Sequence, residues 1–214
     1  SLQSSEWMVH GPPAPIEDFD RIPYVSDAGL NLDQGLRSHL SYRVHEYVAG
    51  LVSRSPVAAD SLLRLAGQLA AEGHDLRITR DLGTAKQYLR ERYAEQPDAR
   101  FGLVASSRDR DLAPFGVPND FQSTKRLRYG PWYGDAEDAP GGRSCRHLRE
   151  CVTEFGAQGL ELDAVLLAWG TDFVRAGAGW SDGRARRYRR GGPPVRDPWQ
   201  LRANAYRVLL TRAR

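Results

Sequence analysis

Apolar residues recur at helical spacing in several stretches of the chain. Across 38–52 they fall on one helix face and Ser38 is a suitable N-cap, so the pattern predicts a helix there. The same spacing predicts helices over 56–72 and 81–93. A further helix is expected to begin at Asp197, where a proline follows at the first helical position, and to continue into the C-terminal segment.

Short apolar runs lie between these helices and predict strands. The runs cover 76–79, 101–105, 150–155 and 164–169, and a short extended segment covers 30–36. Strands that alternate with helices are typical of a parallel sheet covered by helices. The sequence therefore predicts an α/β fold with a parallel sheet.

Two long stretches interrupt the alternation. Residues 106–144 are rich in Pro, Gly and Asp with scattered aromatic residues, and 170–196 contain Trp180 and the basic run 184–190. Stretches of this length between elements are often functional. Arginines interleaved with an aromatic side chain can follow a phosphate backbone and stack on a base, whereas in a solvated hairpin the same charges only keep a loop soluble. Both interpretations remain open. The candidate nucleic-acid residues of this insert are Trp180, Arg184, Arg186, Arg187, Tyr188, Arg189 and Arg190.

Length and composition indicate a soluble globular protein. The chain has 214 residues, a length that is sufficient to bury a hydrophobic core. Its hydrophobic content of 41% and its mean hydropathy of −0.55 are ordinary for a soluble globular protein. No apolar run is long enough to span a bilayer, and residues 1–15 lack the basic and apolar regions of a signal peptide, so we expect a cytoplasmic location. The net charge of +3 permits nucleic-acid binding without requiring it.

The chain has two cysteines, Cys145 and Cys151, with His147 between them. This spacing invites a zinc site, but a closed structural site needs four ligands and no fourth His or Cys lies nearby in sequence. We therefore expect free thiols and no metal. Cys151 is predicted to lie in a buried strand and Cys145 near the end of a surface loop.

Three sequence motifs follow one another along the chain. LDQGLRS covers 32–38, TEFGAQGLELD covers 153–163 and NAYRVLLTRAR covers 204–214. They resemble the L-x-Q-N-Y-R-S, T-x-H-x-x-[KQ]-G-L-E-[FL]-D and YVALTRAR motifs of superfamily 1 helicases. The residues of these motifs resemble most closely those of one branch, the Schlafen-like (group 3) DNA/RNA helicase domain family of bacterial proteins. Its members carry a tryptophan-containing hairpin between the last two motifs.

This resemblance covers 30–214 and implies a RecA-like (P-loop NTPase-type) fold, the second of the two such domains in a helicase. Residues 1–29 are then an N-terminal extension or linker, and 106–144 and 170–196 are insertions within the domain. The family usually places one more strand after TRAR. We therefore expect the chain to be a fragment of a longer protein.

The resemblance also implies roles for individual residues. Arg37 and Arg212 look like the paired arginines that reach the γ-phosphate of ATP across an interdomain cleft, a task that suits a planar, permanently charged guanidinium. Thr153 and Phe155 lie where the family contacts single-stranded nucleic acid, although many superfamily 1 proteins have a histidine in place of Phe155. The residues implied to contact the nucleotide are Gln34, Gln158, Gly159 and Glu161.

Each of these positions also has a structural interpretation. Arg37 can cap a helix or pair with Asp33. Glu161 can be a surface carboxylate, and Gly159 can simply turn the chain between two strands. At single positions the two interpretations are balanced, and the ordered set of motifs favours function.

The chain lacks the motifs that hold most of a nucleotide. Neither Lys86 nor Lys125 follows a glycine-rich phosphate loop, and no apolar strand ends in an acidic pair for Mg²⁺. We expect ATP and Mg²⁺ to be held mainly by another domain of the parent protein, and this chain alone to hydrolyse no ATP. The leading interpretation is the C-terminal RecA-like domain of an NTP-dependent helicase or translocase that acts on single-stranded DNA or RNA. The alternative is a non-motor module for nucleic-acid binding or protein interaction.

Overall fold

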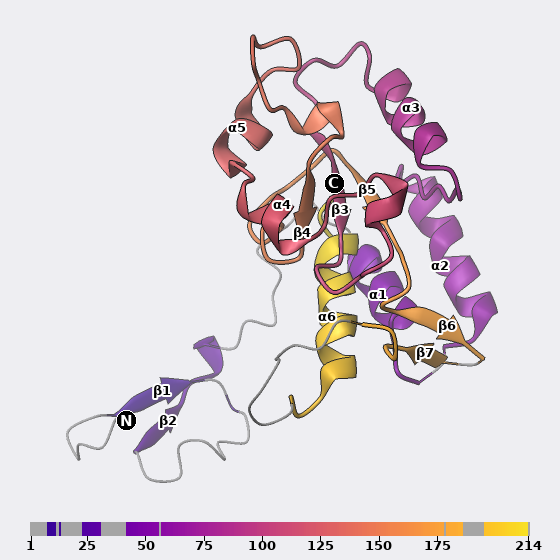
Figure 1. Ribbon diagram of the computed structural model, residues 1–214. Helices are drawn as coiled ribbons and strands as arrows, with labels where there is room; N and C mark the ends of the chain where they lie inside the picture. The colour runs from indigo at the N-terminus through magenta and orange to yellow at the C-terminus, as the bar shows by residue number, and fades with distance from the viewer. Residues whose placement is uncertain are drawn as a thin grey trace. The chain divides into compact units, whose positions relative to one another are not determined.

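A computed structural model describes most of the chain (Figure 1). The residues that it describes are 8–11, 13, 23–30, 42–55, 57–177, 179–185 and 195–213. The chain divides into two compact units, residues 1–39 and 40–214, and each is described by itself.

The first unit contains a small parallel pair of strands. β1 (Val9–Gly11) pairs with β2 (Tyr24–Ser26), and a short 3-10 helix, η1 (Ala28–Leu30), follows. Asp27 supports this turn, because its carboxylate accepts a hydrogen bond from the Gly29 amide at 2.8 Å. Neither of these two strands was predicted, because their three residues carry little periodicity.

The second unit is built on a three-stranded parallel sheet. Its strands are β4 (Cys151–Thr153), β3 (Phe101–Ala105) and β5 (Ala164–Ala168), with β3 in the middle. β3 pairs in parallel with both neighbours, and all five of its residues are buried. The predicted α/β class with a parallel sheet is confirmed, as are strands within the predicted runs 101–105, 150–155 and 164–169.

The long helices of the second unit confirm the predicted ones closely. The helices are α1 (Tyr42–Leu51), α2 (Ala59–Ala71), α3 (Leu82–Arg92), α4 (Phe121–Lys125), α5 (Tyr129–Gly134) and α6 (Pro198–Leu210). α4 and α5 lie inside the first insert, 106–144, which therefore contains helices as well as loop. Across the described residues, we find no helix with the length and apolar character needed to cross a membrane.

Two local expectations are wrong. Residues 76–79 form no strand, and the Ile78 side chain is 99% exposed, so this stretch does not contribute to the sheet. Cys145 is buried in a short 3-10 helix, η3 (Cys145–His147), rather than near the surface. Cys151 is buried in β4 as predicted, and burial raises the pKa of its thiol. Within the described ranges, no group of three or more His, Cys, Asp or Glu side chains is placed to hold a metal ion.

Helices cover both faces of the sheet. Successive side chains of a strand point to opposite faces. Leu103 of β3 therefore packs on one face in a cluster with Leu89 of α3, while Val104 packs on the other with Trp132 of α5 and Leu209 of α6. The sheet is thus the middle layer of the second unit, and α6 holds a fixed position against it.

Aromatic rings join the second insert to α6. β6 (Val174–Ala176) and β7 (Gly179–Ser181) form an antiparallel hairpin, which agrees with the tryptophan-containing hairpin implied by the resemblance. Trp180 of β7 stacks on Phe173 with ring centroids 4.9 Å apart, and Phe173 stacks on Tyr206 of α6 at 5.4 Å. The hairpin is therefore anchored through its aromatic side chains.

Candidate functional site

The TEFGAQGLELD and NAYRVLLTRAR segments meet beside the start of β5. The Leu162 amide donates to the Arg212 carbonyl at 2.9 Å, and Leu162 and Ala213 form a parallel β-bridge. The Arg212 guanidinium donates from Nε to the Val208 carbonyl at 2.9 Å and from Nη1 to the Leu160 carbonyl at 3.5 Å. Leu160 and Arg212 are 52 residues apart in sequence. The fold thus joins two motifs that the sequence keeps separate.

Arg212 lines a hollow of about 410 Å³ formed by residues of α1 and the C-terminal end of α6. Its other polar lining side chains are His45, Arg207 and Thr211, and no carboxylate from the described part of the chain lines it. Arg207 is half-buried, and its Nε has no hydrogen-bond partner among the described residues. The two guanidinium groups of the lining suit the hollow to an anion such as a phosphate.

The loop between β4 and β5 contains the other residues expected at a nucleotide. Gly159 has a φ of +83°, in the left-handed region that favours glycine, so a residue with a Cβ would be strained in this turn. Gln158 is exposed and Glu161 is half-buried. The Glu161 carbonyl accepts a hydrogen bond from the Tyr133 hydroxyl at 2.8 Å. The loop backbone is therefore held by the first insert, while the Gln158 side chain faces solvent.

Thr153 and Phe155 lie at the carboxyl end of β4. Thr153 is 5% exposed, and its carbonyl accepts a hydrogen bond from the Ala157 amide at 2.8 Å, which turns the chain after the strand. Phe155 is 63% exposed. Of the two, only the Phe155 side chain is open to a large ligand in this conformation.

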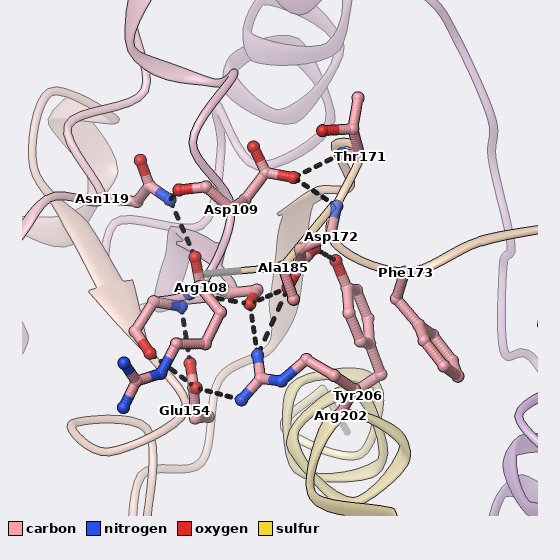
Figure 2. Close-up of polar contacts among 12 residues, drawn as sticks. Arg108, Asp109, Asn119, Glu154, Thr171, Asp172, Phe173, Ala185, Arg202 and Tyr206 are labelled. Carbon is pink, nitrogen blue, oxygen red and sulfur yellow. Dashed lines mark hydrogen bonds and ion pairs between the residues drawn. The ribbon is translucent and has the colours of Figure 1, made fainter. Parts of the chain in front are cut away.

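A buried network of charges lies at the carboxyl end of the sheet, and our sequence analysis missed it (Figure 2). Arg202 of α6 is 2% exposed. It donates to the Ser106 hydroxyl at 2.7 Å, to the Asp172 carboxylate at 3.2 Å and to the Glu154 carboxylate at 3.3 Å. Tyr206, one turn further along α6, donates its hydroxyl proton to Asp172 at 2.6 Å. Arg202 therefore forms ion pairs with both Glu154 and Asp172, two carboxylates that are almost fully buried.

This network connects all three strands to α6. Ser106 directly follows β3, Glu154 directly follows β4, and Asp172 comes shortly after β5. Burial raises the pKa of Asp172, against the opposing effects of the Ser106 and Tyr206 hydrogen bonds and the Arg202 charge. Burial also raises the pKa of Tyr206, and the nearby Asp172 charge adds to this shift. The edge where open parallel sheets often bind ligands is thus filled by the protein's own charges.

The two inserts are tied to the same edge. The Asp109 carboxylate accepts hydrogen bonds from the backbone amides of Thr171 and Asp172, the latter at 3.0 Å. The Asn119 side-chain amide donates to the Ser106 carbonyl at 2.8 Å and to the Asp109 carbonyl at 3.1 Å. A polar residue directly after β3 and β4, and shortly after β5, was the available sequence signal. Arg202 contacts Ser106, Glu154 and Asp172, but nothing in the sequence near Arg202 indicates this, because the residue lies on a helix far along the chain.

Two of the hairpin residues expected to bind nucleic acid, Trp180 and Arg184, have partners within the protein. Trp180 is half-buried, and its indole N–H donates to the Leu51 carbonyl at 2.7 Å. Arg184 forms an ion pair with Asp111 at 2.7 Å, with 66% of the arginine side chain exposed. Their role in nucleic-acid binding stays a prediction. The expected site residues that lie outside the described residues are Gln34, Arg37, Arg186, Arg187, Tyr188, Arg189 and Arg190.

The chain matches a known protein family over nearly its whole length. A model of the family described as Schlafen group 3, DNA/RNA helicase domain matches residues 3–214. The match covers all three motifs and both inserts. No curated protein and no solved structure matches the chain.

Proposed function

Since the chain belongs to the Schlafen group 3 DNA/RNA helicase domain family, we propose that it acts as the second RecA-like domain of an NTP-dependent helicase or translocase. In this proposal another domain of the parent protein holds most of the ATP and its Mg²⁺, while this domain supplies Arg37 and Arg212 to the γ-phosphate. The partner is a single strand of DNA or RNA. Closure of the two domains on ATP, and opening after hydrolysis, shift the grip on that strand.

The positively charged hollow at the joined motifs carries this proposal. Arg212 and Arg207 contribute two guanidinium groups to it, and His45 adds a group that can hydrogen-bond. Charge accumulates on the transferred phosphoryl group in the transition state, and preoriented cationic donors stabilise it without reorganising. These side chains are the kind that phosphoryl transfer requires from the domain that does not hold the nucleotide.

Arg212 is preorganised by its backbone contacts. Only 8% of the residue is exposed, and the hydrogen bond from Nε to the Val208 carbonyl fixes the direction of the side chain. The contact from Nη1 to the Leu160 carbonyl, at 3.5 Å, is long for a hydrogen bond. A phosphate oxygen at normal hydrogen-bond distance would be a stronger acceptor for this nitrogen. The guanidinium would then present Nη1 to the nucleotide while Nε stays bound to the Val208 carbonyl.

The test is ATP hydrolysis by the parent protein that carries the nucleotide-holding domain. Arg212→Ala and Arg37→Ala should each lower kcat by roughly 10³-fold, with a smaller effect on nucleotide affinity, as for an arginine finger. Lysine should restore activity at neither position, because an ammonium lacks the planar fork of donors. Arg64→Ala removes an exposed arginine of α2 and serves as the matched control.

Circular dichroism and thermal unfolding establish that the variants are folded. Folded Arg212→Ala and Arg37→Ala proteins that keep near-normal ATPase activity in the presence of nucleic acid would contradict the roles given to the two arginines. The domain would then be better described as a non-motor module for binding nucleic acid or protein.

A further inference from the structure

The first insert presents aromatic rings to solvent. Phe121, at the start of α4, is 69% exposed, and Tyr129, at the start of α5, is 42% exposed. α4 is nonetheless well formed, because the Asp120 carboxylate caps it by accepting hydrogen bonds from the Gln122 amide at 2.9 Å and the Ser123 amide at 3.1 Å. Because these rings are exposed, they contribute little hydrophobic stabilisation to the folded domain. Two large exposed rings on one well-formed insert make it a candidate interaction surface.

Tyr129 connects this insert to the loop that follows β4. Its ring lies so close to the Gly156 backbone that a Cβ at this position would overlap it. The residue before Gly156 is Phe155, whose ring is 63% exposed. α4 itself packs beside β4. The Tyr129 ring therefore lies beside the loop that carries Phe155, and α4 with Phe121 lies beside the strand that this loop follows.

Cationic side chains accompany the rings. Lys125, Arg126 and Arg128 are exposed, and the Lys125 ammonium lies 5.8 Å from the Phe121 ring centroid. Neither Arg126 nor Arg128 has a side-chain hydrogen bond or an ion pair with another described residue. Their charges are therefore available to a ligand.

Arg126 and Arg128 also line a hollow of about 420 Å³, together with Ser123, Arg143 and Glu150. Glu150 is the acidic residue of this lining in the described part of the chain, and it is paired with Arg143 at 3.2 Å. The charges of Arg126 and Arg128 are left uncompensated in the lining. The hollow thus presents two cations where a phosphate group can enter.

The α4–α5 surface consists of Phe121, Lys125, Arg126, Arg128, Tyr129 and Phe155. We propose that it binds single-stranded nucleic acid. Phosphates bind at the hollow through Arg126 and Arg128, and bases stack on the exposed rings. A single strand fits better than a duplex because only unpaired bases present their faces to a ring. This inference rests on the proposed function, since it assigns a surface for the strand on which the domain acts.

The occupant follows from the alternation of groups on the surface. An acidic peptide would match the cations, but it offers no flat faces to the rings at 121, 129 and 155. A single strand offers a phosphate and a base in every nucleotide, which matches cations and rings side by side. Of the residues of this surface, only Phe155 belongs to one of the three motifs. The surface would therefore add contacts with the nucleic acid that the motifs do not provide.

The test is a salt titration of binding between the protein and a labelled oligothymidylate or oligouridylate, followed by fluorescence anisotropy. Each arginine that contacts a phosphate contributes about 0.7 to the slope of log affinity against log salt, so Arg126→Ala with Arg128→Ala should flatten the slope by about 1.4. Phe121→Ala should weaken single-strand binding about tenfold at unchanged slope, and duplex binding far less. The matched control is Arg64→Ala with Arg80→Ala, which removes two exposed arginines from α2 and from the segment before α3.

The outcomes separate this surface from the proposed function. If the wild type binds and the Arg126/Arg128 variant keeps the wild-type slope, the proposal that the α4–α5 surface binds nucleic acid is wrong. The ATPase test of Arg212 would still decide the proposed motor function. A wild type that binds neither oligonucleotide at low salt also overturns the surface. Polyglutamate is tested in the same assay. If it binds as tightly as the oligonucleotide, and Phe121→Ala does not weaken this binding, the surface would bind an acidic protein instead. These substitutions are at exposed positions, so a misfolded variant would be detected by its changed unfolding midpoint.

Discussion

Replacing Arg202 by alanine should destabilise the second unit strongly. The residue is 2% exposed, and its partners Asp172 and Glu154 are 0% and 5% exposed. Alanine removes the cation and leaves both carboxylates enclosed without a counter-charge. Removing one partner of a buried ion pair costs about 3–5 kcal/mol. Because domains are commonly stable by about 5–15 kcal/mol, the variant should lose a large part of its free energy of unfolding.

The loss should depend on pH. Burial already raises the pKa of Asp172, and the Arg202 charge opposes that shift, so removing Arg202 should raise the pKa further. Between the unfolded and the native pKa, the native carboxyl holds a proton that the unfolded chain releases. Stability therefore falls as the pH rises through this window. The cost of Arg202→Ala should be smaller at about pH 5 than at about pH 8, because protonation relieves the buried charge.

Urea unfolding followed by tryptophan fluorescence measures both effects, with the cost calculated from the shift in midpoint at constant slope. Arg184→Ala is the control, because its pair with Asp111 is mostly exposed, and it should cost less than about 1 kcal/mol. Adding Asp172→Asn to Arg202→Ala should recover part of the loss, since a neutral amide replaces one unpaired charge. A cost for Arg202→Ala as small as that of the control, and equal at both pH values, would refute the reasoning.

Other substitutions test packing, capping and strand binding. Gly102→Ala should cost about 1–3 kcal/mol in urea unfolding, because the added Cβ would lie 2.6 Å from the Trp132 ring; a wild-type midpoint would contradict that packing. Asp120→Ala removes the cap of α4 and should cost about 1 kcal/mol at neutral pH. Hydrogen bonds from Ser123 lower the Asp120 pKa, so this cap stabilises the protein above the unfolded pKa, and the difference should vanish as the pH falls through the native pKa. Replacing three arginines within 184–190 by alanine should flatten the salt slope of single-strand binding by about two units, and an unchanged slope would leave the hairpin as solvated scaffold.

The sequence by itself determined the elements whose signals are local. β3 is a continuous apolar run, which is typical of a strand buried on both faces. α3 and α6 begin at Asp81 and Asp197, whose carboxylates accept hydrogen bonds from the Thr84 amide at 2.5 Å and the Gln200 amide at 2.9 Å. Caps and periodicity act over a few residues, so they can be read along the chain. The motifs were sufficient to indicate the family in the same way.

Only the tertiary structure decided which distant groups pair. Residues 76–79 have the composition of a strand but no place in the described sheet, and a strand is stable only when its backbone groups are paired. Glu154 and Asp172 lie 48 and 30 residues from Arg202, and no local pattern relates the three. A buried ion pair forms when donor and acceptor come within about 3 Å in a medium that excludes water. Packing of α6 against the sheet sets that distance. The tertiary structure likewise decides that Trp180 stacks on Phe173 while Phe121 and Phe155 remain at the surface.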